Sequence, residues 1–123
     1  MILYRVEHSK EPHRGRFGYL MKWGRLPNPF EDNIGHINTG VEVCACRTIP
    51  EFKLWWKKAA LKQQHSNGYI IAELEVRDGL VKHGGKQVLV ARRKCRVVKK
   101  HSIATFMDVH YPTKPRLLSL PHQ

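Results

Sequence analysis

The sequence predicts an α+β fold with a mainly antiparallel sheet and one principal helix at about residues 49–66. Several short segments alternate apolar and polar residues, which is typical of strands with one buried face. Residues 49–66 instead repeat apolar side chains every three or four positions, as an amphipathic helix does. Short turns join most of the strand segments, so hairpins outnumber crossovers and antiparallel pairing is favoured. The length of 123 residues predicts one domain, residues 1–111, with an extended or flexible tail at 112–123.

The first strand is expected at residues 2–8, "ILYRVEH", because Ile2, Tyr4 and Val6 fall on one face. A long irregular region follows at residues 9–39, and its glycines and prolines favour turns. This region is also rich in aromatic residues. A loop of this length and composition is typical of a functional segment or a packed lid.

The second strand is expected at residues 40–47 and leads directly into the principal helix. Thr48 fits the N-cap of that helix, and Glu51 lies three positions later, which is the capping-box spacing. Trp55 and Trp56 are adjacent on the helix and point about a hundred degrees apart, so at least one of them belongs to the core.

Three further strands are expected at residues 69–76, 86–91 and 94–100. The last two are predicted to pair with each other, with residues 92–94 in the turn between them. Residues 102–111 are ambiguous, because neither a strand nor a helix period dominates there.

The charge balance favours an anionic partner. The chain has 22 Lys and Arg against 10 Asp and Glu, a formal net charge of +12. Such a field attracts nucleic acid, acidic proteins or phosphorylated small molecules. No apolar run is long enough for a membrane span, so no membrane partner is expected.

The positive charge is densest late in the chain, where no acidic residue occurs between Gly79 and Met107. A basic hairpin can lie along a phosphate backbone. The candidate contacts to nucleic acid or an acidic partner are Arg92, Arg93, Lys94 and Arg96. The alternative is a solvated sheet edge whose lysines prevent aggregation. No helix-turn-helix, zinc-finger or RNP motif decides between the two.

The cysteine count of three, at Cys44, Cys46 and Cys95, does not make a closed set of disulfides. The N-terminus also lacks the pattern of a secretion signal. Reduced core thiols and a cytoplasmic location are therefore expected. The spacing matches no metal motif, so no metal site is predicted.

Three polar residues stand out beside these elements. Arg5 is a charged residue in an apolar strand, Thr48 ends the second strand, and Gln87 opens a late strand after a Gly-Gly loop. Their order along the chain resembles that of the ADP-ribosyltransferase fold. The resemblance rests on "LYR" (3–5), "CRT" (46–48) and "GGKQVLVARRKCRVV" (84–98).

The resemblance implies an NAD-binding site. In that family an Arg or His on the first strand contacts the nicotinamide nucleotide, and a Ser or Thr ends a central strand before a helix. It therefore implies catalytic roles for Arg5, Thr48 and Gln87. The candidate cofactor contacts are Tyr4, Phe17, Trp23 and His36, although a loop histidine is the simpler interpretation of the last.

Gln87 departs from the family pattern, which has a glutamate at this position. That carboxylate stabilises the cationic centre that forms as nicotinamide leaves, whereas an amide keeps the hydrogen bonds but loses the charge. Loss of one such stabilising group costs roughly 10²–10³ in rate. The resemblance therefore implies weak activity, different chemistry or a protein that only binds the nucleotide.

A second function remains open. The chain also fits a small basic protein without enzymatic activity that binds nucleic acid or an acidic partner. Phage inhibitors of host defence complexes are small, basic and compact in the same way, which is an analogy of character and not a motif match.

Overall fold

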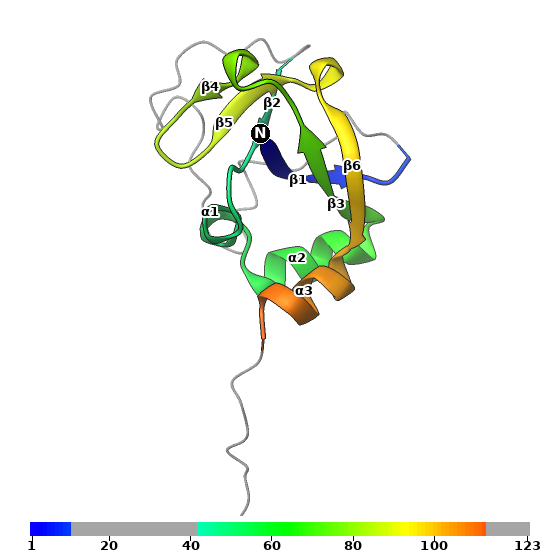
Figure 1. Ribbon diagram of the computed structural model, residues 1–123. Helices are drawn as coiled ribbons and strands as arrows, with labels where there is room; N and C mark the ends of the chain where they lie inside the picture. The colour runs from blue at the N-terminus through cyan, green and yellow to red at the C-terminus, as the bar shows by residue number, and fades with distance from the viewer. Residues whose placement is uncertain (11–41, 113–123) are drawn as a thin grey trace, which may run out of the picture.

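The computed structural model describes residues 1–10 and 42–112 (Figure 1). Within these ranges the chain forms two three-stranded antiparallel sheets and three α-helices. The predicted α+β class with antiparallel pairing is therefore confirmed. Phe17, Trp23, His36 and nearly all of the predicted tail lie outside the described residues.

The first sheet has the order β1-β3-β6 and contains β1 (Ile2–His8), β3 (Tyr69–Glu75) and β6 (Arg96–Ser102). Both pairings are antiparallel. Strand β3 lies in the centre, and its register with β6 shifts between Glu73 and Leu74. Strand β6 is consequently an edge strand.

The second sheet has the order β2-β5-β4 and contains β2 (Glu42–Ala45), β5 (Val88–Ala91) and β4 (Lys82–His83). Reciprocal backbone hydrogen bonds of 2.8 and 2.9 Å between Tyr4 and Cys46 join it to the first sheet. The two sheets therefore meet along β1 and the chain just after β2.

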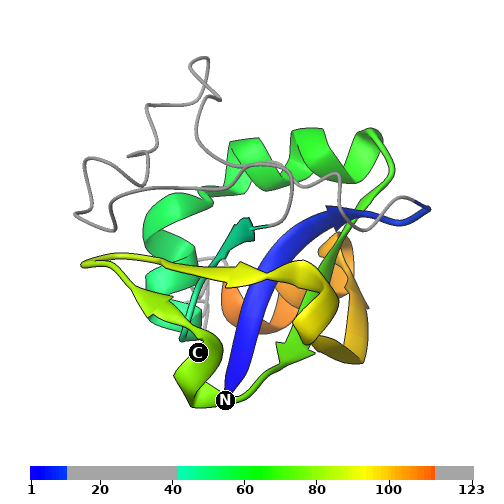
Figure 2. The ribbon, with the colours of Figure 1, turned by 90° about the horizontal axis from the view of Figure 1, so that it is seen from above.

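The predicted hairpin of residues 86–91 and 94–100 is wrong. Both edges of β5 are already paired, one with β2 and the other with β4, so β6 pairs with β3 instead. The 3-10 turn η3 (Arg92–Lys94) connects the two strands. In the view of Figure 2 the yellow arrow of β5 passes across β1 (blue), and the chain then turns through η3 into β6.

The principal helix predicted at 49–66 is divided into α1 (Ile49–Trp55) and α2 (Lys58–Ser66). Trp56 has an extended backbone, with φ −111° and ψ 100°, which ends α1. Because the helix breaks there, both tryptophans are buried in the core, at 2% and 0% exposure. The ambiguous segment forms α3 (Ile103–His110), which begins after the N-cap Ser102.

The core has two parts, one on each face of β1. Val6 belongs to a cluster with the helical residues Phe52, Trp56 and Phe106. Leu3, two positions from Arg5, belongs to a second cluster between the sheets.

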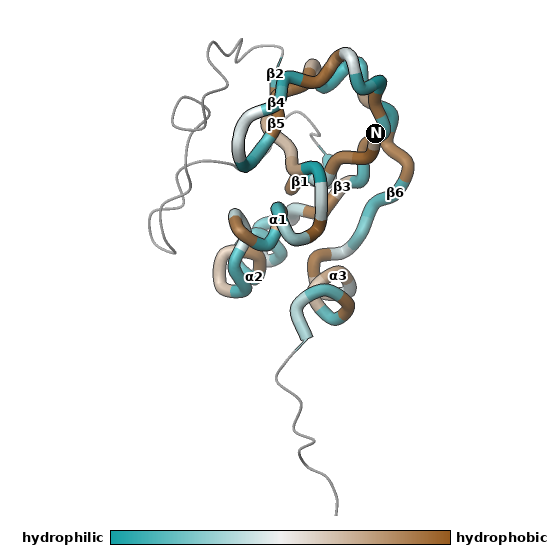
Figure 3. Tube along the Cα trace, turned by 60° about the vertical axis from the view of Figure 1, so that its left-hand side comes forward, coloured by the Kyte–Doolittle hydropathy of each residue, from teal (hydrophilic) through white to brown (hydrophobic). Residues whose placement is uncertain are grey.

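In Figure 3 the middle of β6 is a hydrophilic (teal) stretch that leads to α3. No helix in the described ranges is long and apolar enough to cross a membrane.

Candidate functional site

Arg5 is an interior cation. Its side chain lies on the face of β1 that points between the sheets, and the residue is only 5% exposed. Nη1 donates to the Glu7 carboxylate at 3.3 Å and to the Val6 carbonyl at 3.4 Å. Burial lowers the pKa of the guanidinium, and the nearby Glu7 charge opposes that effect. Its Nε is buried with no hydrogen-bond partner among the described residues.

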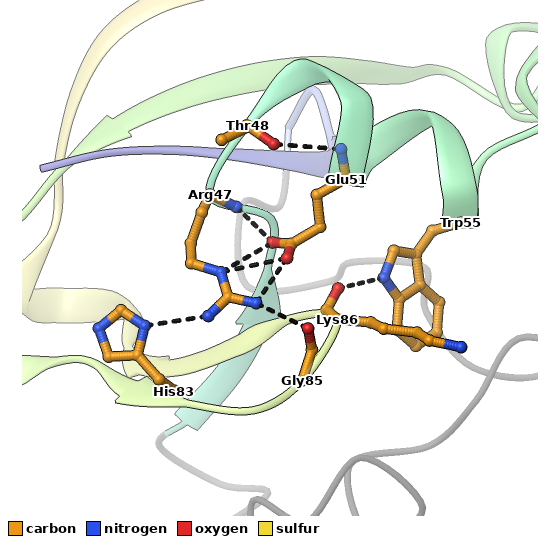
Figure 4. Close-up of polar contacts among 7 residues, drawn as sticks. All are labelled: Arg47, Thr48, Glu51, Trp55, His83, Gly85 and Lys86. Carbon is orange, nitrogen blue, oxygen red and sulfur yellow. Dashed lines mark hydrogen bonds and ion pairs between the residues drawn. The ribbon is translucent and has the colours of Figure 1, made fainter.

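Thr48 is the N-cap of α1, as the sequence predicts. Its hydroxyl accepts a hydrogen bond from the Glu51 backbone N at 3.1 Å (Figure 4). The Glu51 carboxylate in turn accepts from the Arg47 backbone N at 2.8 Å and from Arg47 Nη2 at 2.5 Å. Helix capping therefore explains the positions of the Thr48 and Glu51 side chains without a catalytic role.

The loop before β5 is fixed to α1 by Arg47, which precedes the helix, and by Trp55, which ends it. Arg47 Nη2 donates to the Gly85 carbonyl at 3.1 Å, and Trp55 Nε1 donates to the Lys86 carbonyl at 2.5 Å. Figure 4 shows both contacts, with His83 against the Arg47 guanidinium. These contacts hold the loop at residues 83–86 against α1.

Gln87 follows this loop and is completely buried. Neither atom of its amide group has a hydrogen-bond partner in residues 1–10 and 42–112. Val88 and Val90 point into the cluster that contains Leu3, so alternation directs Gln87 to the opposite face. Arg5 points with Leu3. No hydrogen bond or ion pair within residues 1–10 and 42–112 joins Arg5, Thr48 and Gln87 to one another.

Of the four cations predicted to contact a partner, one is buried and three are exposed. Arg92 is 7% exposed, and its Nε and Nη2 donate to the Glu7 carboxylate at 2.6 and 3.1 Å. The hydrogen bond to Glu7 raises the pKa of Arg92. Arg92 is therefore an interior residue and not a surface contact. Arg93, Lys94 and Arg96 are exposed, and Arg96 pairs with Glu75 at 2.5 Å.

The exposed cations continue along the edge strand. Lys99 and Lys100 are exposed on β6, and neither has an ion-pair partner within the described residues. We call this set the β6 cationic surface, and its members are Arg93, Lys94, Arg96, Lys99 and Lys100. It occupies the outer edge of β6, which pairs only with β3 among the described residues, and the turn before it.

A cavity of about 350 Å³ lies beside this surface. Its lining comes from β1, β3, β6, α1 and α3 and consists of Tyr4, Ile49, Glu73, Lys99, His101, Thr105, Phe106, Val109 and His110. His101 Nε2 contacts the Glu73 carboxylate across the two strands. The Phe106 ring lies between the rings of His101 and His110, at centroid distances of 5.4 and 4.4 Å.

Of the predicted cofactor contacts in the described residues, Tyr4 lines this cavity. Burial, and then the Glu73 charge, raises the pKa of its hydroxyl. Tyr4 therefore lines the cavity as an uncharged phenol. The sequence analysis singled out neither His101 nor His110 as a site residue. The cavity depends on the register of β3 with β6, which places Glu73 opposite Lys99 and which the sequence does not specify.

The thiols do not form a site. Cys46 is buried, Cys44 and Cys95 are half-buried, and none of the three forms a disulfide. Burial raises the pKa of the Cys46 thiol well above its ordinary value. In the described part of the chain, no group of three or more His, Cys, Asp or Glu residues is arranged to hold a metal ion.

The fold and the exposed groups define a small α+β protein with a cationic edge strand beside a partly polar cavity. A family model described as the Bacteriophage T4 Y00F protein matches residues 1–104, from β1 to the start of α3. The chain belongs to this family. Comparisons with curated proteins and with solved structures found no match.

Proposed function

We propose that this member of a phage protein family is a non-enzymatic protein that binds nucleic acid through the β6 cationic surface. The observation that carries the proposal is the outer edge of β6, where Lys99 and Lys100 are exposed without an ion-pair partner among the described residues. The formal net charge of +12 attracts a polyanion to the molecule as a whole.

The shape of the surface favours a linear partner. A strand rises about 3.3 Å per residue, so residues 94–100 span about 20 Å. That length covers roughly six phosphates at about 3.4 Å each along one strand of B-form DNA. Lys99 and Lys100 project from opposite faces of this edge strand, so a phosphate backbone that follows the edge can meet cations on both sides.

NAD-dependent transfer has less support. The resemblance to ADP-ribosyltransferases requires Arg5 and Gln87 to reach one ligand, and both side chains are buried, at 5% and 0% exposure. The Arg5 guanidinium is also paired with Glu7. The transferase function therefore stays a prediction from sequence, and binding is the function that the geometry favours.

The test is a matched pair of charge reversals. One variant carries Lys99→Glu and Lys100→Glu on β6, and the other carries Lys58→Glu and Lys62→Glu at exposed positions of α2. Each variant lowers the net charge by the same amount. Binding to a fluorescein-labelled 12-nucleotide single strand, read by anisotropy, should weaken at least about tenfold in the β6 variant and much less in the α2 variant.

Equal weakening in both variants would show that only the overall charge matters and would contradict the proposed surface. Binding of polyglutamate as tight as that of the oligonucleotide, at the same salt, would favour an acidic protein partner instead. Such a partner could belong to a host defence complex, as the size and charge of the chain allow.

A further inference from the structure

We infer that the cavity beside β6 holds the base of one unpaired nucleotide, so that the protein prefers single-stranded to double-stranded nucleic acid. The inference rests on the proposed function, because it concerns the same bound strand. It adds a second element of recognition, a seat for a base, to the electrostatic contact with the backbone.

Lys99 connects the two sites. It belongs to the β6 cationic surface and also lines the cavity. A phosphate bound at Lys99 therefore places the attached nucleotide at the mouth of the cavity. The volume of about 350 Å³ falls within the range of small-molecule sites, which starts at roughly 300 Å³.

The walls suit a flat ring. Tyr4 and Ile49 are half-buried and line one part of the cavity, and Phe106 lies against both histidines. Proteins that bind single strands combine a positive groove with aromatic side chains on which the bases stack. Phe106 itself is only 1% exposed, so the half-buried Tyr4 offers the larger accessible carbon ring for stacking.

Charge decides which part of the nucleotide enters. The Glu73 carboxylate lines the cavity and would repel a phosphate, whereas it can accept a hydrogen bond from a base amino group. His101 contacts this carboxylate and fixes its position. The phosphate therefore stays with Lys99 and the base occupies the cavity. A base paired within a duplex cannot enter in this way.

Anisotropy measurements with a labelled 12-nucleotide single strand and its duplex test the inference. The wild type should bind the single strand at least about tenfold more tightly than the duplex. Tyr4→Leu should remove most of that preference by weakening single-strand binding about tenfold, with duplex binding unchanged. Tyr4→Phe keeps the ring and should retain the preference, which separates stacking from folding.

His65→Ala, at an exposed position on α2 outside this cavity, serves as the control and should behave as the wild type. Equal wild-type affinity for both forms, or equal losses for both in Tyr4→Leu, would overturn the inference while leaving the β6 surface intact. If the wild type binds neither the single strand nor the duplex, the proposed function and this inference are both overturned. Addition of a nucleoside monophosphate should also shift the His101 and His110 ring resonances, and unchanged resonances at saturating ligand would contradict the cavity.

Discussion

The Glu7 carboxylate accepts a hydrogen bond from Arg92 Nε at 2.6 Å, although the two residues are 85 positions apart in the sequence. The same carboxylate accepts from Arg5, so one buried anion faces two buried guanidinium groups. The contact ties η3 to β1. It therefore fixes the point from which the cationic edge strand begins.

Removal of the Glu7 charge should destabilise the fold strongly. Glu7→Gln leaves two buried guanidinium groups without a counter-charge, and loss of one partner from a buried pair typically costs about 3–5 kcal/mol. The free energy of unfolding in urea measures this loss. Glu75→Gln breaks an exposed pair with Arg96 and should change the stability little. Similar small losses in the two variants would contradict the structural role given to Glu7.

The Tyr111 hydroxyl should make stability depend on alkaline pH. It donates to the Trp56 carbonyl at 2.5 Å, and burial, followed by the charge of Cys46, raises its pKa. In the unfolded chain a tyrosine ionises near its ordinary pKa of 10.0. The unfolded state therefore loses this proton first, and stability should fall as pH rises above about 10.

Tyr111→Phe is the matched variant. It should be less stable than the wild type near neutral pH by about 0.5–1.5 kcal/mol, because the hydrogen bond is lost. Its stability should then fall less steeply above pH 10, whereas the other groups that titrate there affect both proteins alike. Urea unfolding from pH 8 to 11 measures the two slopes, and identical slopes would refute a half-buried Tyr111 that stays protonated in the folded state.

Thr48 should behave as a helix cap and not as a catalytic residue. Thr48→Ala removes the acceptor for the Glu51 backbone N and should cost about 1 kcal/mol, whereas Thr48→Ser should retain most of the stability. Thermal and urea unfolding of the three proteins give the comparison. Equal stability of the alanine variant and the wild type would remove the capping role.

Gln87 gives the sharpest test of the transferase prediction. Gln87→Glu restores the acidic residue of the ADP-ribosyltransferase pattern but places an unpaired carboxylate at a position of 0% exposure. We expect marked destabilisation and no release of nicotinamide from NAD. Gln87→Leu should be tolerated, because the amide has no partner among the described residues. A stable glutamate variant that releases nicotinamide would support the transferase instead.

Local patterns predicted the elements that depend on local chemistry. The alternation of residues 2–8 and 69–76 matches β1 and β3 closely, and the cap at Thr48 follows from its spacing to Glu51. The principal helix was predicted without its break because the break depends on packing. The extended backbone at Trp56 ends α1, and the Trp56 ring is completely buried in the core.

The errors concern contacts between distant parts of the chain. Arg92 looks like a surface cation in its basic surroundings, and only Glu7 at the other end of the chain explains its burial. The cavity was missed for the same reason, since Tyr4, Glu73 and His101 come from three strands whose register the sequence does not specify. Lys94 and Arg96 were recognised as exposed cations because exposure of such residues is the general rule.

The salt dependence of oligonucleotide binding tests the central claim most directly. The logarithm of the association constant falls linearly with the logarithm of salt concentration, with a slope of about −0.7 per phosphate contact on a single strand. We expect Lys99→Glu with Lys100→Glu to reduce the steepness of this slope by about 1.5, and Lys58→Glu with Lys62→Glu to leave it near the wild-type value. A slope that is the same in both variants, or wild-type binding that does not depend on salt, would contradict a phosphate-binding surface on β6.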